Sequence, residues 1–549
     1  MPTQTPARTS YVPRRASRGR AIFNLALIQA LILAGLGLAF GPRGLAAYER
    51  YQATRPQTEA RNGLWTVVAT SPVRSVHAIL EDTGNILLMA GTGNNGSLGG
   101  KVVTNLPTSD FKAAVFNPST MSFLSLTAEW DVFCGGHVIL PDGNILVSGG
   151  TRKYELVSGQ QTLTQFQGVR NSAIFDVTTN RWINTGPLNQ ARWYPTLVRA
   201  GLPNMVIVVS GLDQHGNLDR GTTEEFDQKT NQWVVDNIPR KQFPTYPALF
   251  QTAWPGWLFW SGANSGYGSA SLTARQPGLW NFQSGEFVPV DGLPEPLANE
   301  TAGTVLLPPA QNQKFMIFGG GGAAVTSADT ARTAIVDLDS TDPRYVRGPD
   351  LDHARRYPLA TILPDDTVLI AGGAGGYRAD DILSAESYNP ATNTMREVAR
   401  PEVGRDYHSE AILTNSGAVF YFGSNPLSED SFFEMRVEEY QPPYFFEGPR
   451  PAIISSPSAV ALGGVIRIHV RYNSDSPITK IRLIAPSAYT HVTDTSQRSV
   501  AATILSQRNG WMTVQLPANP NLLIPGYYML FAVNARGLPS VAPWIRVVA

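Results

Sequence analysis

Apolar and polar positions repeat in one pattern along the chain from residue 77 onward. Each copy has a polar or aromatic start, an apolar run, a turn, a second apolar run and a pair of small residues. Short apolar runs joined by turns are typical of β-hairpins. The seven copies are HAILEDTGNILLMAG from His77, HVILPDGNILVSGG from His137, YPTLVRAGLPNMVIVVSG from Tyr194, YPALFQTAWPGWLFWSG from Tyr246, TAGTVLLPPAQNQKFMIFGGGG from Thr301, YPLATILPDDTVLIAGGAGG from Tyr357 and YHSEAILTNSGAVFYFGS from Tyr407.

A second hairpin signature follows these copies, for example AAVFNPSTMSFLSL and SAIFDVTTNRWINT. Two hairpins per repeat predict a four-stranded blade. Successive copies start 50 to 60 residues apart, and kelch propeller blades repeat at roughly 50 residues. We therefore predict an all-β fold with a seven-bladed kelch-type β-propeller over residues 64–448, in which residues 64–69 supply the strand that closes the ring. A closed ring hides nearly all sheet edges.

The repeat ends before residue 449, and a different strand pattern follows. Residues 449–549 contain alternating runs such as VIRIHVRY, KIRLIAP, MTVQLP and YYMLFAVN, separated by turn residues. This pattern predicts a separate immunoglobulin-like β-sandwich domain.

The N-terminal segment differs from the rest of the chain. Residues 1–20 contain five arginines, and residues 21–41 contain no charge; such a run has roughly the 20-residue length that spans a bilayer as a helix. We expect a basic cytoplasmic tail over 1–20, a transmembrane anchor over 21–41 and a linker over 42–63. The protein would then lie in the cell membrane with one span and an extracytoplasmic body. The alternative is a cleaved signal and a secreted protein.

The composition narrows the choice of partners. The 43 basic and 43 acidic side chains balance, so no overall positive charge favours nucleic acid, and we expect no nucleic-acid partner. We also expect the protein to be a monomer. The 50 glycines and 41 prolines suit many short strands and tight turns. Cys134 is the single cysteine, so it cannot form an intramolecular disulfide even in an oxidising compartment.

The residues that open the repeats are candidates for chemistry, because loops at one end of a propeller converge on its axis. Cys134 lies three residues before His137 and would reach the same end. Thiolate, imidazole and tyrosinate groups all bind redox metals, and mixed nitrogen and oxygen ligands favour Cu(II). By spacing alone, these side chains could equally seal the blade ends. The opening residues are His77, His137, Tyr194, Tyr246, Tyr357, Tyr407 and His408.

Five strings in the chain resemble signatures of the copper radical oxidases, the family of glyoxal oxidase and galactose oxidase. They occur in the family's order over about residues 64–549. The resemblance implies a copper-dependent oxidase built as a propeller followed by a sandwich domain. The strings are DVFCGGHVILPDGNILVSGG, ARWYPT, GRDYHSEAIL, APSAYTHVTDTSQR and LIPGYYMLFAVNARGLPSVAPWIRV.

The resemblance also implies roles for five residues. Cys134 and Tyr194 match the pair that the family joins through a thioether, which makes the tyrosine both a copper ligand and the site of a stable radical. Tyr407 matches the axial ligand and general base. His408 and His491 match the equatorial histidine ligands, and His491 belongs to the sandwich domain. Copper and the radical together would accept the two electrons of substrate oxidation, and O2 would return the site to its starting state as it becomes H2O2.

The remaining candidates have plainer alternatives. Family members commonly stack an aromatic ring on the cross-link, and His215 is the candidate for this cover against an ordinary turn residue. His137 either lines the pocket or is structural, and Gly135 and Gly136 are expected to turn the backbone into the strand. Packing or surface roles are expected for His77, His353 and His469. Pairing between blades, rather than substrate binding, is expected for Arg192, Arg356 and Arg405.

The substrate class follows from the resemblance. Galactose oxidases usually carry a carbohydrate-binding domain before the propeller, whereas here only the linker precedes the first blade, and the string RWYPT is closer to glyoxal oxidases. We expect small aldehydes such as glyoxal or methylglyoxal to be oxidised as hydrates to carboxylic acids, with O2 reduced to H2O2. The alternatives are a galactose-oxidase-like oxidase of primary alcohols on glycans and a non-catalytic kelch module for binding or adhesion. The expected partners are a small aldehyde or alcohol, O2 and, through the N-terminal helix, the membrane.

Overall fold

The computed structural model describes most of the chain beyond its N-terminal segment. Among these residues, no helix is both long and apolar enough to cross a membrane. The predicted tail, the predicted anchor and most of the predicted linker lie outside the described residues. Residues Arg61–Ala549 form one compact unit. The described residues are 55, 57–158, 161–200, 205–235, 240–266, 275–295, 298–322, 328–376, 378–425 and 433–549.

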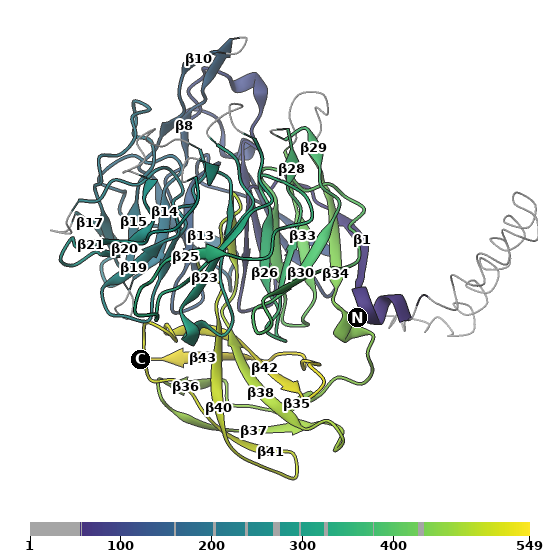
Figure 1. Ribbon diagram of the computed structural model, residues 1–549. Coiled ribbons are helices and arrows are strands. Elements are labelled where there is room, and N and C mark those ends of the chain that lie inside the picture. The colour runs from purple at the N-terminus through teal and green to yellow at the C-terminus, as the bar shows by residue number, and fades with distance from the viewer. Residues whose placement is uncertain are drawn as a thin grey trace, which may run out of the picture. The chain divides into compact units, whose positions relative to one another are not determined.

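Seven antiparallel sheets form the blades of a propeller, which confirms the predicted seven-bladed all-β architecture (Figure 1). The first three blades are β2 (His77–Leu80), β3 (Ile86–Gly91), β4 (Lys112–Asn117) and β5 (Ser122–Thr127); β6 (Gly136–Ile139), β7 (Ile145–Ser148), β12 (Ser172–Asp176) and β13 (Arg181–Asn184); and β14 (Thr196–Arg199), β15 (Val206–Val209), β16 (Glu224–Asp227) and β17 (Gln232–Val234). The next three are β18 (Leu249–Gln251), β19 (Trp257–Trp260), β20 (Gly278–Asn281) and β21 (Phe287–Pro289); β22 (Gly303–Leu306), β23 (Lys314–Phe318), β24 (Thr333–Asp337) and β25 (Tyr345–Arg347); and β26 (Leu359–Ile362), β27 (Val368–Ala371), β30 (Ala385–Asn389) and β31 (Thr394–Glu397).

The seventh blade joins the two ends of the propeller sequence. It consists of β32 (Glu410–Leu413), β33 (Val419–Phe422), β34 (Arg436–Gln441) and β1 (Leu64–Thr70). Strand β1 pairs antiparallel with β34, and the two lie side by side in Figure 1. Trp65 packs its ring 4.9 Å from the ring of Tyr421, and its indole N–H donates to the carbonyl oxygen of Ala399. The predicted closing strand is therefore confirmed.

Burial explains the alternation within each blade. The innermost strands are almost fully buried, as in β2 and β32, because neighbouring innermost strands pack around the axis. Outer strands such as β5 and β13 are largely exposed. The apolar runs of the sequence repeat correspond to the two inner strands, and the third strands, such as β4 and β12, are also mostly buried.

The C-terminal region forms the predicted β-sandwich. The long strand β40 pairs with β41 near one end and with β38 near the other, so it belongs to both sheets. Figure 1 shows this domain below the propeller. In spatial order, the strands are β35 (Ala452–Ser455), β37 (Val465–Arg471), β41 (Trp511–Gln515), β40 (Ser499–Arg508), β38 (Ile478–Ile484), β42 (Gly526–Asn534), β43 (Trp544–Val548) and β36 (Ala459–Ala461).

One segment of the sandwich domain enters the propeller. Between β38 and β40, strand β39 (Ala488–Thr490) pairs antiparallel with β2 and becomes a fifth strand on the axial side of the first blade. Thr490 is the register partner of His77. The residue after β39, His491, is thereby carried into the axis of the propeller.

Short strand pairs extend the propeller at the end away from the sandwich, where Figure 1 shows β8, β10, β28 and β29. The pairs are β8 (Thr151–Lys153) with β11 (Gln167–Gly168), β9 (Leu156–Ser158) with β10 (Gln161–Thr164), and β28 (Ala374–Gly375) with β29 (Asp380–Asp381). Short 3-10 helices occur at η1 (Gly96–Leu98), η2 (Thr108–Asp110), η5 (Ala310–Asn312) and η7 (Pro443–Phe445).

Candidate metal centre

Six of the seven innermost strands are preceded by a non-glycine residue in the left-handed backbone conformation. Each of these residues lies two or three positions before its strand. Positive φ is uncommon for residues with a side chain and concentrates at functional sites. His491, with φ 48°, shares this conformation after β39. The six residues are Cys134, Tyr194, Tyr246, Thr301, Tyr357 and His408, with φ between 44° and 64°.

The glycine pair after Cys134 has a role other than the expected turn. The left-handed residue is Cys134 itself, and neither glycine has positive φ. A Cβ atom on Gly136 would lie 2.4 Å from Cδ1 of Leu197 in the next blade. Glycine therefore allows blades 2 and 3 to approach closely, and the backbone N–H of Tyr194 donates to the carbonyl oxygen of Cys134 at 2.9 Å.

The five residues matched to the oxidase motifs meet at one place on the axis. Nε2 of His408 lies 2.9 Å from Nε2 of His491, and Sγ of Cys134 lies 3.5 Å from Nε2 of His491. These three atoms lie within 4.8 Å of one another. The phenol oxygens of Tyr194 and Tyr407 are in direct contact. Blades 2, 3 and 7 and the inserted sandwich segment thus each supply at least one donor.

Polar neighbours orient both imidazoles. The hydroxyl of Thr490 donates to the carbonyl oxygen of Val76 at 2.9 Å, and the same oxygen lies 2.5 Å from Nδ1 of His491. Because the hydroxyl hydrogen of Thr490 is already donated to Val76, the hydroxyl oxygen accepts a hydrogen bond from Nδ1–H of His491. The free lone pair of the His491 imidazole is then on Nε2. The side-chain amide of Asn425 lies 3.3 Å from Nδ1 of His408. Such partners are what hold histidine ligands in place around a metal.

Burial sets the protonation of the donors. It lowers the pKa of His408, with Arg378 as the next cause, and lowers the pKa of His491, with His408 as the next cause. Both imidazoles are therefore neutral near pH 7, which is the form that binds metals. Burial also raises the pKa of the Cys134 thiol and of the Tyr407 phenol. Without a nearby cation, thiol and phenol keep their protons.

A stack of aromatic rings covers Tyr194. The ring of Trp193 lies parallel to it, with centroids 3.6 Å apart and planes 6° apart, and Phe166 stacks on Trp193 at 4.3 Å. His215, the proposed cover, lies in an exposed turn where its N–H donates to Asp213. The cover is therefore Trp193, the residue directly before Tyr194, and not the expected His215. The left-handed φ of 62° at Tyr194 accompanies this stacking of two sequence neighbours.

Tyr407 marks the accessible side of the site. It is partly exposed, whereas Cys134, Tyr194, His408 and His491 are buried. Its ring stacks on the His408 ring at 3.8 Å, and the guanidinium carbon of Arg378 lies 4.5 Å from the ring centroid. The Arg378 cation is attracted to the face of this ring, which holds the two side chains together at the open side.

The other residues that open the repeats surround these donors. The hydroxyl of Tyr246 donates to the carbonyl oxygen of Gly135 at 2.5 Å, and its ring lies 4.4 Å from that of Tyr194. The ring of Tyr357 lies 5.1 Å from that of Tyr407. The His77 and His137 rings meet edge to face at 5.0 Å, and both are buried.

The remaining candidates lie outside the site. His353 is exposed beside Asp352, and His469 stacks on Trp511. The arginines form ion pairs, but only Arg356 pairs with a residue from the preceding blade, Asp329. The other two arginines pair inside their own blades, Arg192 with Glu224 and Arg405 with Glu438. Each of these two arginines also donates to backbone carbonyls of its own blade, which fixes the loop in front of the innermost strand.

The donor set fits a copper ion by its chemistry. Two neutral imidazole nitrogens, two phenol oxygens and one thiol gather at a mostly buried place, and mixed nitrogen and oxygen donors are those that Cu(II) prefers. Zinc sites of similar size are built mainly from cysteine and histidine with few phenolates.

A comparison with protein families matches the C-terminal domain. The model of the galactose oxidase-like, early set domain matches residues 450–547. This range covers the sandwich together with the inserted segment that carries His491.

Curated relatives match along most of the chain. A galactose oxidase of Gibberella zeae is 26% identical over 512 residues, covering 88% of this chain and 70% of the relative. An aldehyde oxidase GLOX of Vitis pseudoreticulata is 24% identical over 468 residues, covering 79% of this chain and 86% of the relative.

Among solved structures, a fungal alcohol oxidase of the AA5 family in complex with copper superposes with a TM-score of 0.73 at 21% identity. The match covers 89% of this chain and 100% of that structure. At this identity the match establishes the shared fold.

Proposed function

This chain is a homologue of galactose oxidase and of the GLOX aldehyde oxidases, with a galactose oxidase-like domain at its C-terminus, and we propose that it is a mononuclear copper radical oxidase. The observation that carries the proposal is the meeting of Cys134, Tyr194, Tyr407, His408 and His491 at one point. A kelch module used only for adhesion would have no need to gather these five donors.

Each donor has a distinct task in this proposal. His408, His491, Tyr194 and Tyr407 would hold the copper, which when bound supplies one-electron redox chemistry. Tyr407, on the open side, takes the proton from the substrate hydroxyl as general base. Tyr194, joined to Cys134, takes a hydrogen atom from the substrate carbon. Trp193 shields the face of the Tyr194 ring from water.

The cross-link can be tested by intact mass. A bond between Sγ of Cys134 and a ring carbon of Tyr194 removes two hydrogens, which O2 takes up in the presence of copper. Purified protein loaded with Cu(II) in air should lose the mass of two hydrogens and its one titratable thiol. The variant Cys134→Ser should bind copper without the mass change. An unaltered mass in the wild-type protein would exclude the thioether.

The substrates we propose are small aldehydes, taken as hydrates. The overall reaction converts RCH(OH)2 and O2 to RCOOH and H2O2, a balanced two-electron oxidation. The GLOX relative supports this choice, and the galactose oxidase relative supports a second candidate, oxidation of primary alcohols on sugars. Peroxide release measured with glyoxal, methylglyoxal, galactose and simple primary alcohols separates the two. Turnover of sugars alone would favour the second candidate.

We also propose that residues 21–41 tether the enzyme to the cell membrane, with the propeller outside the cytoplasm. The support is the uncharged run itself, preceded by five arginines. Fractionation of cells that express the full chain, with and without residues 1–41, tests this proposal. If cells that express the full chain yield a soluble protein shortened at its N-terminus, the segment is a cleaved signal instead.

A further inference from the structure

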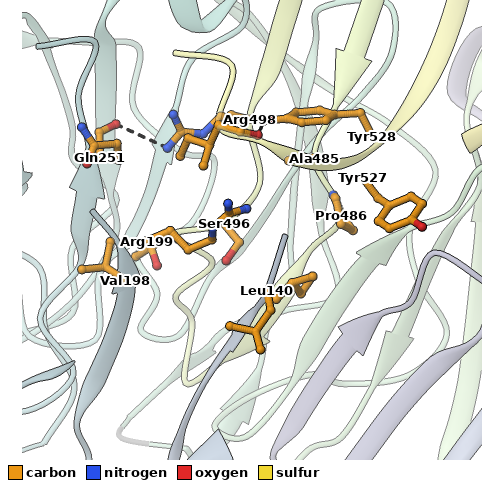
Figure 2. A pocket seen from close by; sticks show the side chains of 13 residues that line it. Leu140, Val198, Arg199, Gln251, Ala485, Pro486, Ser496, Arg498, Tyr527 and Tyr528 are labelled. Atoms are coloured by element: carbon orange, nitrogen blue, oxygen red, sulfur yellow. Dashed lines mark hydrogen bonds between the residues drawn. The ribbon is translucent and has the colours of Figure 1, made fainter. Parts of the chain in front are cut away.

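A cavity of about 50 Å³ lies at the end of the propeller that faces the sandwich domain. Its propeller wall comes from the ends of three innermost strands, with Arg199 at the end of β14 and Gln251 at the end of β18. Its sandwich wall includes Ser496, Arg498 and Tyr528. Figure 2 shows these side chains around the cavity, with a dashed line from Arg498 to Gln251 that crosses between the two domains.

The guanidinium groups of Arg498, which is buried, and Arg199, which is partly buried, line this cavity without a carboxylate partner. In the described part of the chain, neither Arg199 nor Arg498 forms a salt bridge, and the Nε atom of each lacks a hydrogen-bond partner. The other nitrogens of Arg498 donate to the carbonyl oxygens of Asn521 and Gln251. One Nη of Arg199 donates to the carbonyl oxygen of Pro525. The hydrogen bonds that do exist go to neutral acceptors.

The surroundings do not neutralise these charges. Burial lowers the pKa of Arg199 to about 10 and also lowers the pKa of Arg498. A guanidinium group nevertheless keeps its proton in proteins at neutral pH. Asp142 acts on Arg199 from an exposed position beyond salt-bridge distance. The Tyr528 hydroxyl donates to the carbonyl oxygen of Ile524. A buried cation without a counterion is costly, and here the buried Arg498 shares its cavity with the partly buried Arg199.

We propose that this cavity binds a small oxyanion, such as sulfate, phosphate or a short carboxylate, between the guanidinium groups of Arg199 and Arg498. Guanidinium forks match oxyanions in shape and charge. Thr495 and Ser496, which also line the cavity, can add hydroxyl donors. A water needs only about 10–15 Å³ of such space, so the volume admits a group several times larger. The site is separate from the candidate metal centre.

The anion would tie together two segments that also carry candidate copper ligands. Arg199 ends the strand β14 that begins two residues after Tyr194, and Arg498 ends the inserted segment that contains His491. At about 3.3 Å per residue of strand, the cavity lies roughly 16 Å from Tyr194. The anion therefore closes the domain interface behind the metal centre and does not take part in the chemistry.

Calorimetric titration of the copper-loaded protein with sodium sulfate at constant ionic strength tests the proposal. We expect saturable binding of one sulfate per chain. Arg498→Gln should weaken this binding about tenfold to hundredfold, because it removes a charged donor. Arg181→Gln, at an exposed position of β13, is the matched control and should bind sulfate as the wild type does.

Arg498 also donates hydrogen bonds to three backbone carbonyl oxygens, so Arg498→Gln could lose sulfate binding simply by misfolding. A second variant separates these two causes. Ser496→Leu fills the cavity and keeps both arginines. It should abolish sulfate binding while the far-ultraviolet circular dichroism stays unchanged. Phosphate and acetate, titrated in the same way, distinguish an inorganic oxyanion from a carboxylate. Failure of all three anions to bind the wild type would overturn the proposal, and so would equal binding by Ser496→Leu and the wild type.

Discussion

The two ends of the propeller's innermost strands present opposite chemistry. At one end, Cys134 and Tyr194 precede β6 and β14 and face two imidazoles. At the other end, the same β14 finishes in Arg199, which shares a cavity with Arg498. The first end offers electron-pair donors for a cation, and the second offers N–H donors for an anion. The inserted sandwich segment reaches both ends and supplies His491 to one and Arg498 to the other.

This difference shows that, in this propeller, the functional side chains lie at the ends of the innermost strands. The strands between the two ends are four or fewer residues long and almost entirely buried, so they act as rigid spacers. Chemistry is confined to the residues just before and just after them. A change at one end should therefore leave the other end nearly intact.

The largest expected effect comes from removing the ligand that the sandwich domain supplies. His491→Ala should abolish oxidase activity and weaken copper binding by more than about 100-fold, because a direct ligand counts for more than its supporting partners. Copper affinity by competitive chelation and peroxide release are the measurements. The matched control is His469→Ala, in the same domain but stacked on Trp511 away from the axis. Sulfate binding at the other end should survive in both variants.

A smaller loss is expected from the partner that orients His491. Thr490→Val keeps the shape of the side chain but removes the acceptor for Nδ1–H. Copper affinity should fall by about 10- to 100-fold, as is typical for such supporting residues. The same titration with a chelator measures the change. Wild-type affinity in Thr490→Val would mean that the strand pairing of β39 alone fixes the imidazole.

The ring that covers Tyr194 should affect the lifetime of the radical more than copper binding. Trp193→Phe keeps an aromatic side chain but reduces the stacked area on the Tyr194 ring. We expect the radical signal in electron paramagnetic resonance to decay several-fold faster, with copper affinity unchanged. Trp182→Phe, which alters a tryptophan of an outer strand, serves as the control. Equal radical lifetimes in the two variants would assign the protection to another group.

The smallest effect on oxidase activity is expected at a buried carboxyl near the sandwich end of the first blade. Burial raises the pKa of Glu81 from 4.5 to about 7. Because the folded state binds the extra proton, the contribution of Glu81 to stability is largest below pH 4.5 and falls as the pH rises toward 7, by about 1.4 kcal/mol per pH unit. Urea unfolding at pH 5, 6 and 7 should show a shallower loss in Glu81→Gln. An identical slope in the variant would contradict the raised pKa.

Much of the fold could be predicted from the sequence, because blade repeats are local. The apolar runs from His77 to Tyr407 mark the inner strands of the blades, since each hairpin is closed by its own turn. The closing strand was also predictable from an apolar segment ahead of the first repeat. The fifth strand of the first blade was not, because β39 pairs with β2 across some 400 residues and nothing in its three residues specifies that partner.

The residues of the candidate site could be predicted from the sequence, but the neighbouring residues that hold them in place could not. The motifs named Cys134, Tyr194, Tyr407, His408 and His491 through a family resemblance, and the structure brings these residues together. The cover by Trp193 and the contacts of Thr490 and Asn425 with the imidazoles were not foreseen. These depend on left-handed turns and packing between blades, which sequence spacing does not reveal.

The sequence by itself determined the number of blades, the order of the two domains and the residue types brought to the axis, because these follow from local periodicity and short motifs. Only the tertiary structure decided which side chains touch. The inserted segment places His491 beside His408 and Arg498 across from Arg199, and both contacts join residues far apart in the chain. Contacts of that kind arise when packed surfaces meet, so the geometry of both ends belongs to the fold as a whole.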